Sequence, residues 1–317
     1  MEIRKLLRFF LLLPILVFAF CISTVQAQVR VQRTRDVASK KVIGKYNLVV
    51  TYKFNFYYAF DFDINHLPNS KAYDMNLLEI GDNFSRYYSE FADRIDTNDY
   101  KNIINHMPDA DPSAFMDDDW NKQERYEDVY LNYPKVGSLL CRTMIVNTEY
   151  EYTEPINKFS WNFGDSTCNI LGYDCKLATT SFRGRNYKVY YTEEIPLNYG
   201  PWKFCGLPGL ILKVTEEKGM FDWIATDIRQ CSGDLHIYDP SVGKTPGVPE
   251  MKIKKVGRKQ VLKMEKMIWT DNIALEVMHG LIPPKYYEYG PTNERRPLTK
   301  DNWKDLNSPL IPQLETE

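Results

Sequence analysis

The chain has 317 residues, a net charge of −2 at pH 7, 44% hydrophobic residues and 14% aromatic residues. This composition excludes a disordered chain, which buries too little apolar surface to fold. It also shows no basic excess that would attract nucleic acid, so no nucleic-acid partner is expected.

The first 27 residues have the pattern of a secretory signal peptide. Basic residues precede the apolar run Phe9–Ile22, and small residues up to Ala27 suit a cleavage site. The alternative is an uncleaved anchor, but the run contains Pro14 and is shorter than the roughly 20 residues that span a bilayer. We therefore expect an exported protein, periplasmic, outer-membrane associated or extracellular, with no transmembrane span after cleavage.

Five cysteines follow the signal segment, and in an oxidising compartment their default state is the disulfide. Cys168 and Cys175 are close enough in sequence to close a small loop. Cys205 and Cys231 could pair if their strands are neighbours. Spacing alone does not determine the pairing, and an odd count leaves one cysteine over. The chain has no Cys-x-x-Cys pair, so a zinc ribbon or a thioredoxin-type site is poorly supported.

In the first part of the processed chain, the clearest predicted strand is Tyr46–Phe60, where apolar residues alternate with mostly polar ones. Met75–Ile80 and Phe84–Tyr88 are predicted to form a hairpin. Residues 90–105 predict one or two short helices, and the acidic residues after them are interpreted as solvated surface.

Short apolar runs separated by turn residues predict a meander of strands over residues 127–226. Consecutive strands of this kind favour an antiparallel sheet. Residues 240–249 predict an extended loop, residues 252–278 one or two helices, and residues 283–317 a tail over the core. The predicted strands are Glu127–Tyr133, Leu139–Asn147, Phe159–Phe163, Tyr173–Phe182, Tyr187–Tyr191, Leu210–Glu216 and Phe221–Thr226.

The densest local signal is a turn that leads directly into an apolar strand. Proline followed by glycine predicts a type II turn with positive φ at Gly209, and the strand predicts buried Leu210 and Leu212. No side chain of this hexapeptide can act as an acid, base, nucleophile or strong metal ligand, so its predicted role is structural. The hexapeptide is Gly206, Leu207, Pro208, Gly209, Leu210 and Ile211.

Motifs with a known chemistry are missing from the chain. It has no Gly-x-Ser-x-Gly, no Ser-x-x-Lys and no phosphate-binding glycine loop. Its four histidines contain no i, i+4 pair, and Asp61–Asn65 begins like a calcium loop but lacks the required glycine and glutamate. The sequence therefore predicts no catalytic residue, no metal site and no cofactor.

Together with its neighbours, the hexapeptide resembles the GLPGLI family of exported Bacteroidota proteins. Ile170–Ala178, Tyr190–Pro196 and Gly200–Phe204 are similar to further family segments, and the resemblance covers most of the processed chain. The family has no assigned activity, cofactor or catalytic residue, so the resemblance implies none.

The strand order is also loosely similar to that of the half-barrel lipoprotein carriers of the periplasm. This similarity implies an α+β, β-dominated fold with a strongly curved antiparallel sheet and a few helices packed on one side. We expect a β-rich core in residues 28–240 and a C-terminal helical segment and tail, residues 241–317, packed on it.

The expected function is non-enzymatic binding of an apolar ligand or an outer-membrane protein partner in the cell envelope. One alternative is an envelope hydrolase that uses acids such as Asp222, Glu193 or Glu194. A second alternative is a structural subunit of an outer-membrane complex. Fold similarity alone does not decide among these functions.

Overall fold

The computed structural model describes residues 40–57, 71–93, 127–145, 148–239, 253–270, 287–289, 295–297 and 314–315. Its main feature is a twelve-stranded sheet in the order β12-β6-β5-β4-β3-β2-β1-β11-β10-β9-β8-β7. The strands are β1 (Lys40–Tyr57), β2 (Lys71–Ile80), β3 (Ser85–Ser89), β4 (Glu127–Leu131), β5 (Ser138–Ile145), β6 (Thr148–Pro155), β7 (Asn162–Ile170), β8 (Tyr173–Phe182), β9 (Arg185–Thr192), β10 (Leu210–Glu216), β11 (Phe221–Tyr238) and β12 (Lys254–Lys255). A separate short pair joins β13 (Tyr287–Tyr289) and β14 (Arg295–Pro297).

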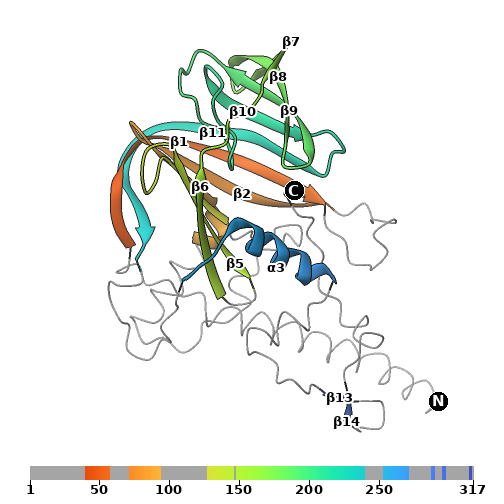
Figure 1. Cartoon of the computed structure of the whole chain (residues 1–317). Helices are drawn as coiled ribbons and strands as arrows, with labels where there is room; N and C mark the ends of the chain where they lie inside the picture. Colours follow the sequence, from red (N-terminus) through yellow and green to blue (C-terminus); the bar gives the residue numbers. More distant parts are fainter. Residues whose placement is uncertain are drawn as a thin grey trace, which may run out of the picture.

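Two long strands form the centre of the sheet. β1 and β11 are antiparallel along nearly their whole length, from Lys40 opposite Tyr238 to Phe56 opposite Phe221. β2 to β6 extend the sheet on one side and β10 to β7 on the other, and the sheet curls strongly between these two arms (Figure 1). The prediction of a β-dominated, curved antiparallel sheet is confirmed, although β12 pairs with β6 in parallel.

Most predicted strands are present, but several differ from the sequence interpretation. β1 begins six residues before the predicted Tyr46, and β2 begins four residues before the predicted Met75. β6 was not predicted, because its alternating tyrosine and charged residues resemble a loop. β7 begins at Asn162 and continues to Ile170, well beyond the predicted Phe159–Phe163. β11 extends twelve residues past its predicted end at Thr226, because pairing with β1 continues through a polar stretch.

The core lies on the face of the sheet that carries Tyr52, Phe54 and Phe56, here called the inner face. These residues are at most 2% exposed, as the alternation in β1 predicts. The ring of Phe54 stacks on Trp223 of β11 at 4.4 Å between centroids, and Trp202 stacks on Trp223 from a loop. Stacked and edge-on aromatic pairs therefore fill the inner face.

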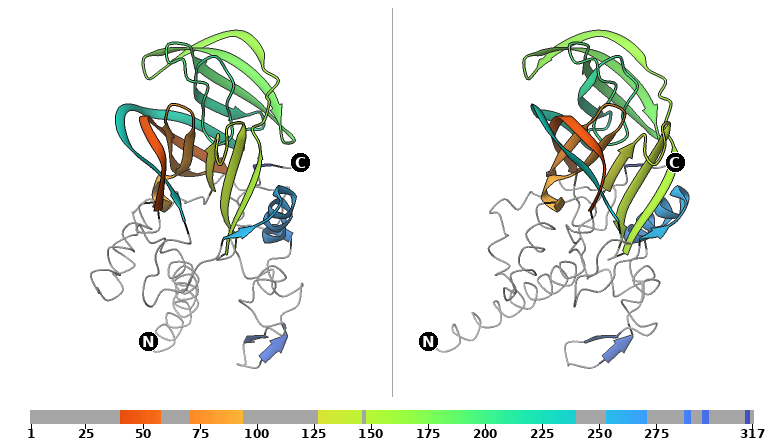
Figure 2. Two further views of the ribbon diagram at one scale, coloured as in Figure 1. Left: turned by 60° about the vertical axis from the view of Figure 1, so that its left-hand side comes forward. Right: turned by 90° about the vertical axis from the view of Figure 1, so that its left-hand side faces the viewer.

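One helix is seated beside the arm formed by β5 and β6 (Figure 2). α3 (Arg258–Thr270) packs Val261 and Met264 onto the core, where they are 2% and 3% exposed. It confirms the helical prediction for residues 258–270. The prediction is wrong for residues 253–257, where Lys254–Lys255 form β12 against β6, and residues 271–278 lie outside the described residues. The predicted domain boundary at residue 240, the acidic loop and the signal segment lie outside them as well.

Candidate functional site

Gly209 of the hexapeptide packs directly against the backbone of β9. A Cβ added at Gly209 would lie 1.9 Å from the carbonyl oxygen of Thr192, the last residue of β9. The predicted positive φ at Gly209 is wrong: φ is positive at Gly206 instead, with a value of 88°. Leu210 and Leu212 are both 0% exposed, so their predicted burial is confirmed. Glycine is thus required at position 209 by close approach, and at 206 by backbone conformation.

The loop before the hexapeptide inserts three bulky side chains into the core. Trp202, Lys203 and Phe204 are at most 1% exposed. Trp202 has a φ of 53°, a left-handed conformation that costs a residue with a bulky side chain roughly 1–3 kcal/mol. Such strain persists only where packing enforces it, so the loop is held in place by its contacts.

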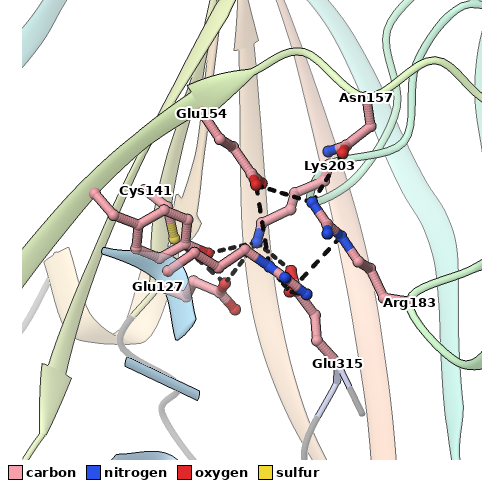
Figure 3. A network of polar contacts seen from close by, with 9 residues as sticks. Glu127, Cys141, Glu154, Asn157, Arg183, Lys203 and Glu315 are labelled. Atoms are coloured by element: carbon pink, nitrogen blue, oxygen red, sulfur yellow. Dashed lines mark hydrogen bonds and ion pairs between the residues drawn. The ribbon is translucent and has the colours of Figure 1, made fainter. Parts of the chain in front are cut away.

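Lys203 is the centre of a buried polar cluster, named here the Lys203 network (Figure 3). Its ammonium donates to the carboxylate of Glu315 and, at 2.6 Å, to the hydroxyl of Tyr152 on β6. Glu127 of β4 lies 3.9 Å from the same nitrogen and accepts a bond of 3.4 Å from the Cys141 thiol. Residues far apart in the sequence therefore converge on one lysine.

Two arginines extend the Lys203 network toward the other arm of the sheet. Arg258 of α3 donates to Glu315, and Arg183, in the turn between β8 and β9, lies 3.9 Å from it. Arg183 also donates to Glu154 at 2.8 Å and to the side-chain oxygen of Asn157 at 2.9 Å. These bonds join the two arms of the sheet, since Glu154 belongs to β6.

Charges in the Lys203 network support each other's ionised forms. Burial by itself lowers the pKa of Lys203, but the carboxylates of Glu315 and Glu127 outweigh it and raise the pKa above its ordinary value. Burial raises the pKa of Glu315, but Lys203 and Arg258 outweigh it and lower the pKa. Lys203 therefore stays a protonated ammonium at neutral pH, which is neither a nucleophile nor a base.

A pocket of ≈ 360 Å³ opens beside the hexapeptide and is named here the Trp161 pocket. Gly206 and Cys205 form part of its wall, and Phe159 joins it to the core by packing on Phe204 at 5.5 Å. The pocket combines aromatic and amide side chains from three of the four chain segments that line it. These are Phe159, Trp161 and Tyr199 together with Asn132, Asn157 and Asn198.

Two residues that line this pocket each carry a hydrogen-bond donor without a partner. The indole nitrogen of Trp161 and the amide nitrogen of Asn157 are both buried and unbonded. Because Gly206 has no side chain, the space next to the indole nitrogen of Trp161 stays open. A Cβ at Gly206 would lie 3.8 Å from that nitrogen. An unpaired buried donor costs about 1–3 kcal/mol, so this arrangement favours a ligand that supplies acceptor oxygens.

The candidate disulfides are not formed in the structure, where all five described cysteines are free. Cys168 and Cys175 lie directly opposite each other on β7 and β8. Cys205 is buried and Cys231 is exposed, and nothing brings this second pair into register. Both pairings stay predictions.

We expect the Cys168–Cys175 bond in protein purified from an oxidising compartment. Opposed residues of antiparallel strands have Cα atoms roughly 4.5–5.5 Å apart, within the range that a disulfide spans. Mass spectrometry of the non-reduced peptide containing both cysteines should show it two hydrogens lighter than the reduced form. Full alkylation of both thiols before reduction would contradict the pairing.

The three acids considered for hydrolysis each have a separate hydrogen-bond partner. Glu193 bonds the exposed Lys176, and Glu194 accepts from the backbone of Asp174. Asp222 accepts from Thr215 at the far end of β10, about five residues or roughly 16 Å along the strand.

Among the described residues, no group of three or more metal-ligating side chains could hold a metal ion. No described helix is long and apolar enough to cross a membrane.

Sequence reasoning missed Lys203, Asn157 and Trp161. The available signal for Lys203 was a single charge inside an apolar, turn-rich segment, which predicts either exposure or a buried partner. Asn157 and Trp161 gave no signal, because their role depends on segments that meet only in the fold.

Residues 126–239 match the protein family described as "N-glycanase peptide, N-terminal domain". Two solved structures, titled "Structure of PNGF-II in P21 space group" and "Structure of PNGF-II in C2 space group", are similar at 17% sequence identity, with TM-scores of 0.42 and 0.39. The matches cover 69% and 68% of this chain, which spans only 33% and 32% of theirs. No curated protein matches this chain.

Proposed function

We propose that this chain is a non-enzymatic, glycan-binding protein of the cell envelope and that the Trp161 pocket is its binding site. The observation that carries the proposal is the pair of buried, unbonded donors on Trp161 and Asn157. A sugar offers acceptor oxygens for such donors, and its apolar ring faces pack on aromatic side chains such as Phe159 and Tyr199.

The size and composition of the pocket agree with this ligand class. Its ≈ 360 Å³ falls in the range of about 300–1,000 Å³ for small-molecule sites. An acetamido sugar suits it best, because a carbonyl oxygen accepts two hydrogen bonds and the attached methyl group packs on the rings. The matched family also favours glycans: its printed name is that of an N-glycanase domain, and residues 126–239 include every residue that lines the pocket.

A lipid ligand receives less support from the same structure. The inner face of the described sheet is occupied by Trp202, Phe204 and Trp223, each at most 1% exposed. The amide-rich Trp161 pocket would leave its donors unpaired against an acyl chain. We therefore propose a polar, hydroxylated ligand in place of the apolar one that the sequence favoured.

Export and family membership complete the proposal. The signal-like segment Phe9–Ile22 supports secretion into the periplasm or beyond. The hexapeptide and its neighbouring segments support membership of the GLPGLI family. A structural role in an outer-membrane complex is compatible with glycan binding, because the Trp161 pocket could recognise a glycosylated partner.

The test is calorimetric titration of the purified protein with N,N′-diacetylchitobiose and with cellobiose, two disaccharides that differ in their acetamido groups. We expect a Kd of about 1 mM or tighter for the acetylated sugar and weaker binding of cellobiose. Trp161→Phe keeps an aromatic ring but removes the indole donor and part of the ring surface, so it should weaken binding roughly 3- to 10-fold.

Phe163 supplies the matched control for this titration. It lies two residues from Trp161, is 65% exposed and does not line the pocket. Phe163→Ala should leave the affinity unchanged. Equal binding by the wild type and Trp161→Phe, or no binding of either disaccharide, would overturn the proposed site.

A further inference from the structure

Asn157 connects the Lys203 network to the Trp161 pocket. Its side-chain oxygen accepts a hydrogen bond from Arg183 at 2.9 Å, its nitrogen is buried and unbonded, and the residue lines the pocket. A guanidinium only donates, so the amide atom that faces Arg183 must be the oxygen. Arg183 therefore fixes the orientation of the Asn157 amide, so the amide atom left without a partner is the donor nitrogen and not the acceptor oxygen.

Arg183 is in turn held by the carboxylates of the Lys203 network. It donates to Glu154 at 2.8 Å and lies 3.9 Å from Glu315. Glu315 is 4% exposed and also pairs with Lys203 and Arg258 (Figure 3). Because Leu314 and Glu315 pack on the core, the Glu315 carboxylate lies beside Arg183, the residue that orients Asn157.

We infer that Arg183 is a positioning residue for the Trp161 pocket. We infer also that the packing of residues 314–315 on the core, called seating here, and ligand binding favour each other. This inference rests on the proposed function for its ligand-binding half. Its physical basis is linkage: if seating improves the orientation of Asn157, a ligand that bonds Asn157 must favour seating by the same factor.

The test titrates N,N′-diacetylchitobiose into Arg183→Lys, Asn157→Ala and the double variant. Lysine keeps the charge but cannot hold Glu154 and Asn157 in one planar geometry. We expect each single variant to weaken binding about 10-fold, and the double variant to be no weaker than Asn157→Ala within about 2-fold. Additive losses would overturn the positioning role, because a merely structural effect of Arg183 does not depend on Asn157.

Arg185, the first residue of β9 and two positions after Arg183, provides a matched control. It pairs with Glu216 at 3.5 Å and lies over the ring of Phe221, whereas Arg183 pairs with Glu154 and Asn157. Arg185→Lys should bind the disaccharide as the wild type does. An equal loss in Arg185→Lys and Arg183→Lys would contradict the inference, since it would show a general effect of the turn.

Hydrogen–deuterium exchange gives a readout that needs no ligand. Glu315→Gln should increase exchange around residues 156–158 and 183, whereas Glu127→Gln, which alters only the Lys203 side of the network, should not. If exchange responds in this way and the wild type binds no sugar, the positioning role stands and the proposed function fails. If the wild type binds but Glu315→Gln changes neither affinity nor exchange, the linkage is wrong.

Discussion

A Gly209→Val variant is expected to lose about 3 kcal/mol or more of its free energy of unfolding. The first side-chain carbon would lie 1.9 Å from the carbonyl oxygen of Thr192, which is backbone and cannot rotate away. Thr192 is opposite Leu210 where β9 pairs with β10, so relief of the clash must separate these strands. Urea denaturation followed by circular dichroism should show a lower midpoint or no cooperative transition.

Gly257→Ala is the control for this variant. Nothing lies within 4 Å of a Cβ added at Gly257, and its φ is not positive, so we expect a change of at most about 1 kcal/mol. A Gly209→Val protein with the midpoint of the wild type would show that β9 and the hexapeptide are not packed as described. That result would also revive a role for the hexapeptide in contacting a ligand.

Local patterns were sufficient to predict the strands in which the order of apolar and polar residues matches the order of buried and exposed positions. Tyr173–Phe182 and Leu210–Glu216 have the predicted bounds, because each alternates or is apolar throughout and is bounded by turn residues. The polar second half of β11 could not be predicted. It is a strand only because β1, more than 170 residues earlier in the chain, pairs with it.

The hexapeptide shows the same limit at the level of single residues. Proline followed by glycine fits a type II turn, yet Gly209 is required by the approach of Thr192, a contact that local propensity does not encode. The candidate site was harder still. The partner of Lys203 is Glu315, 112 positions away in sequence, and only the fold brings the two together.

A Lys203→Met variant is the second change with a large expected effect. It removes the cation that pairs with Glu315 and lies near Glu127, leaving buried carboxylates with fewer counter-charges. Breaking one side of a buried ion pair typically costs about 3–5 kcal/mol, and we expect a loss in that range. The urea midpoint at neutral pH measures it.

An exposed ion pair provides the contrast. Lys176 and Glu193 are 2.7 Å apart, but their side chains are 56% and 47% exposed. Water screens such a pair, so Lys176→Met should leave the urea midpoint unchanged. Equal effects of Lys203→Met and Lys176→Met would mean that the Lys203 network is solvated.

The pH dependence of the Lys203→Met effect tests its electrostatic origin. The pKa of Glu315 is lowered in the folded protein, so its contribution is present above the unfolded value of about 4.3 and is lost as pH falls through the folded pKa. The pKa of Lys203 is raised, so its contribution is present below about 10.4 and is lost as pH rises through the folded pKa. The stability difference between wild type and Lys203→Met should therefore be constant from about pH 5 to pH 10 and shrink at lower pH. A difference that persists undiminished in acid would mean that Lys203 stabilises the fold through the packing of its stem, because packing does not depend on the charge of Glu315.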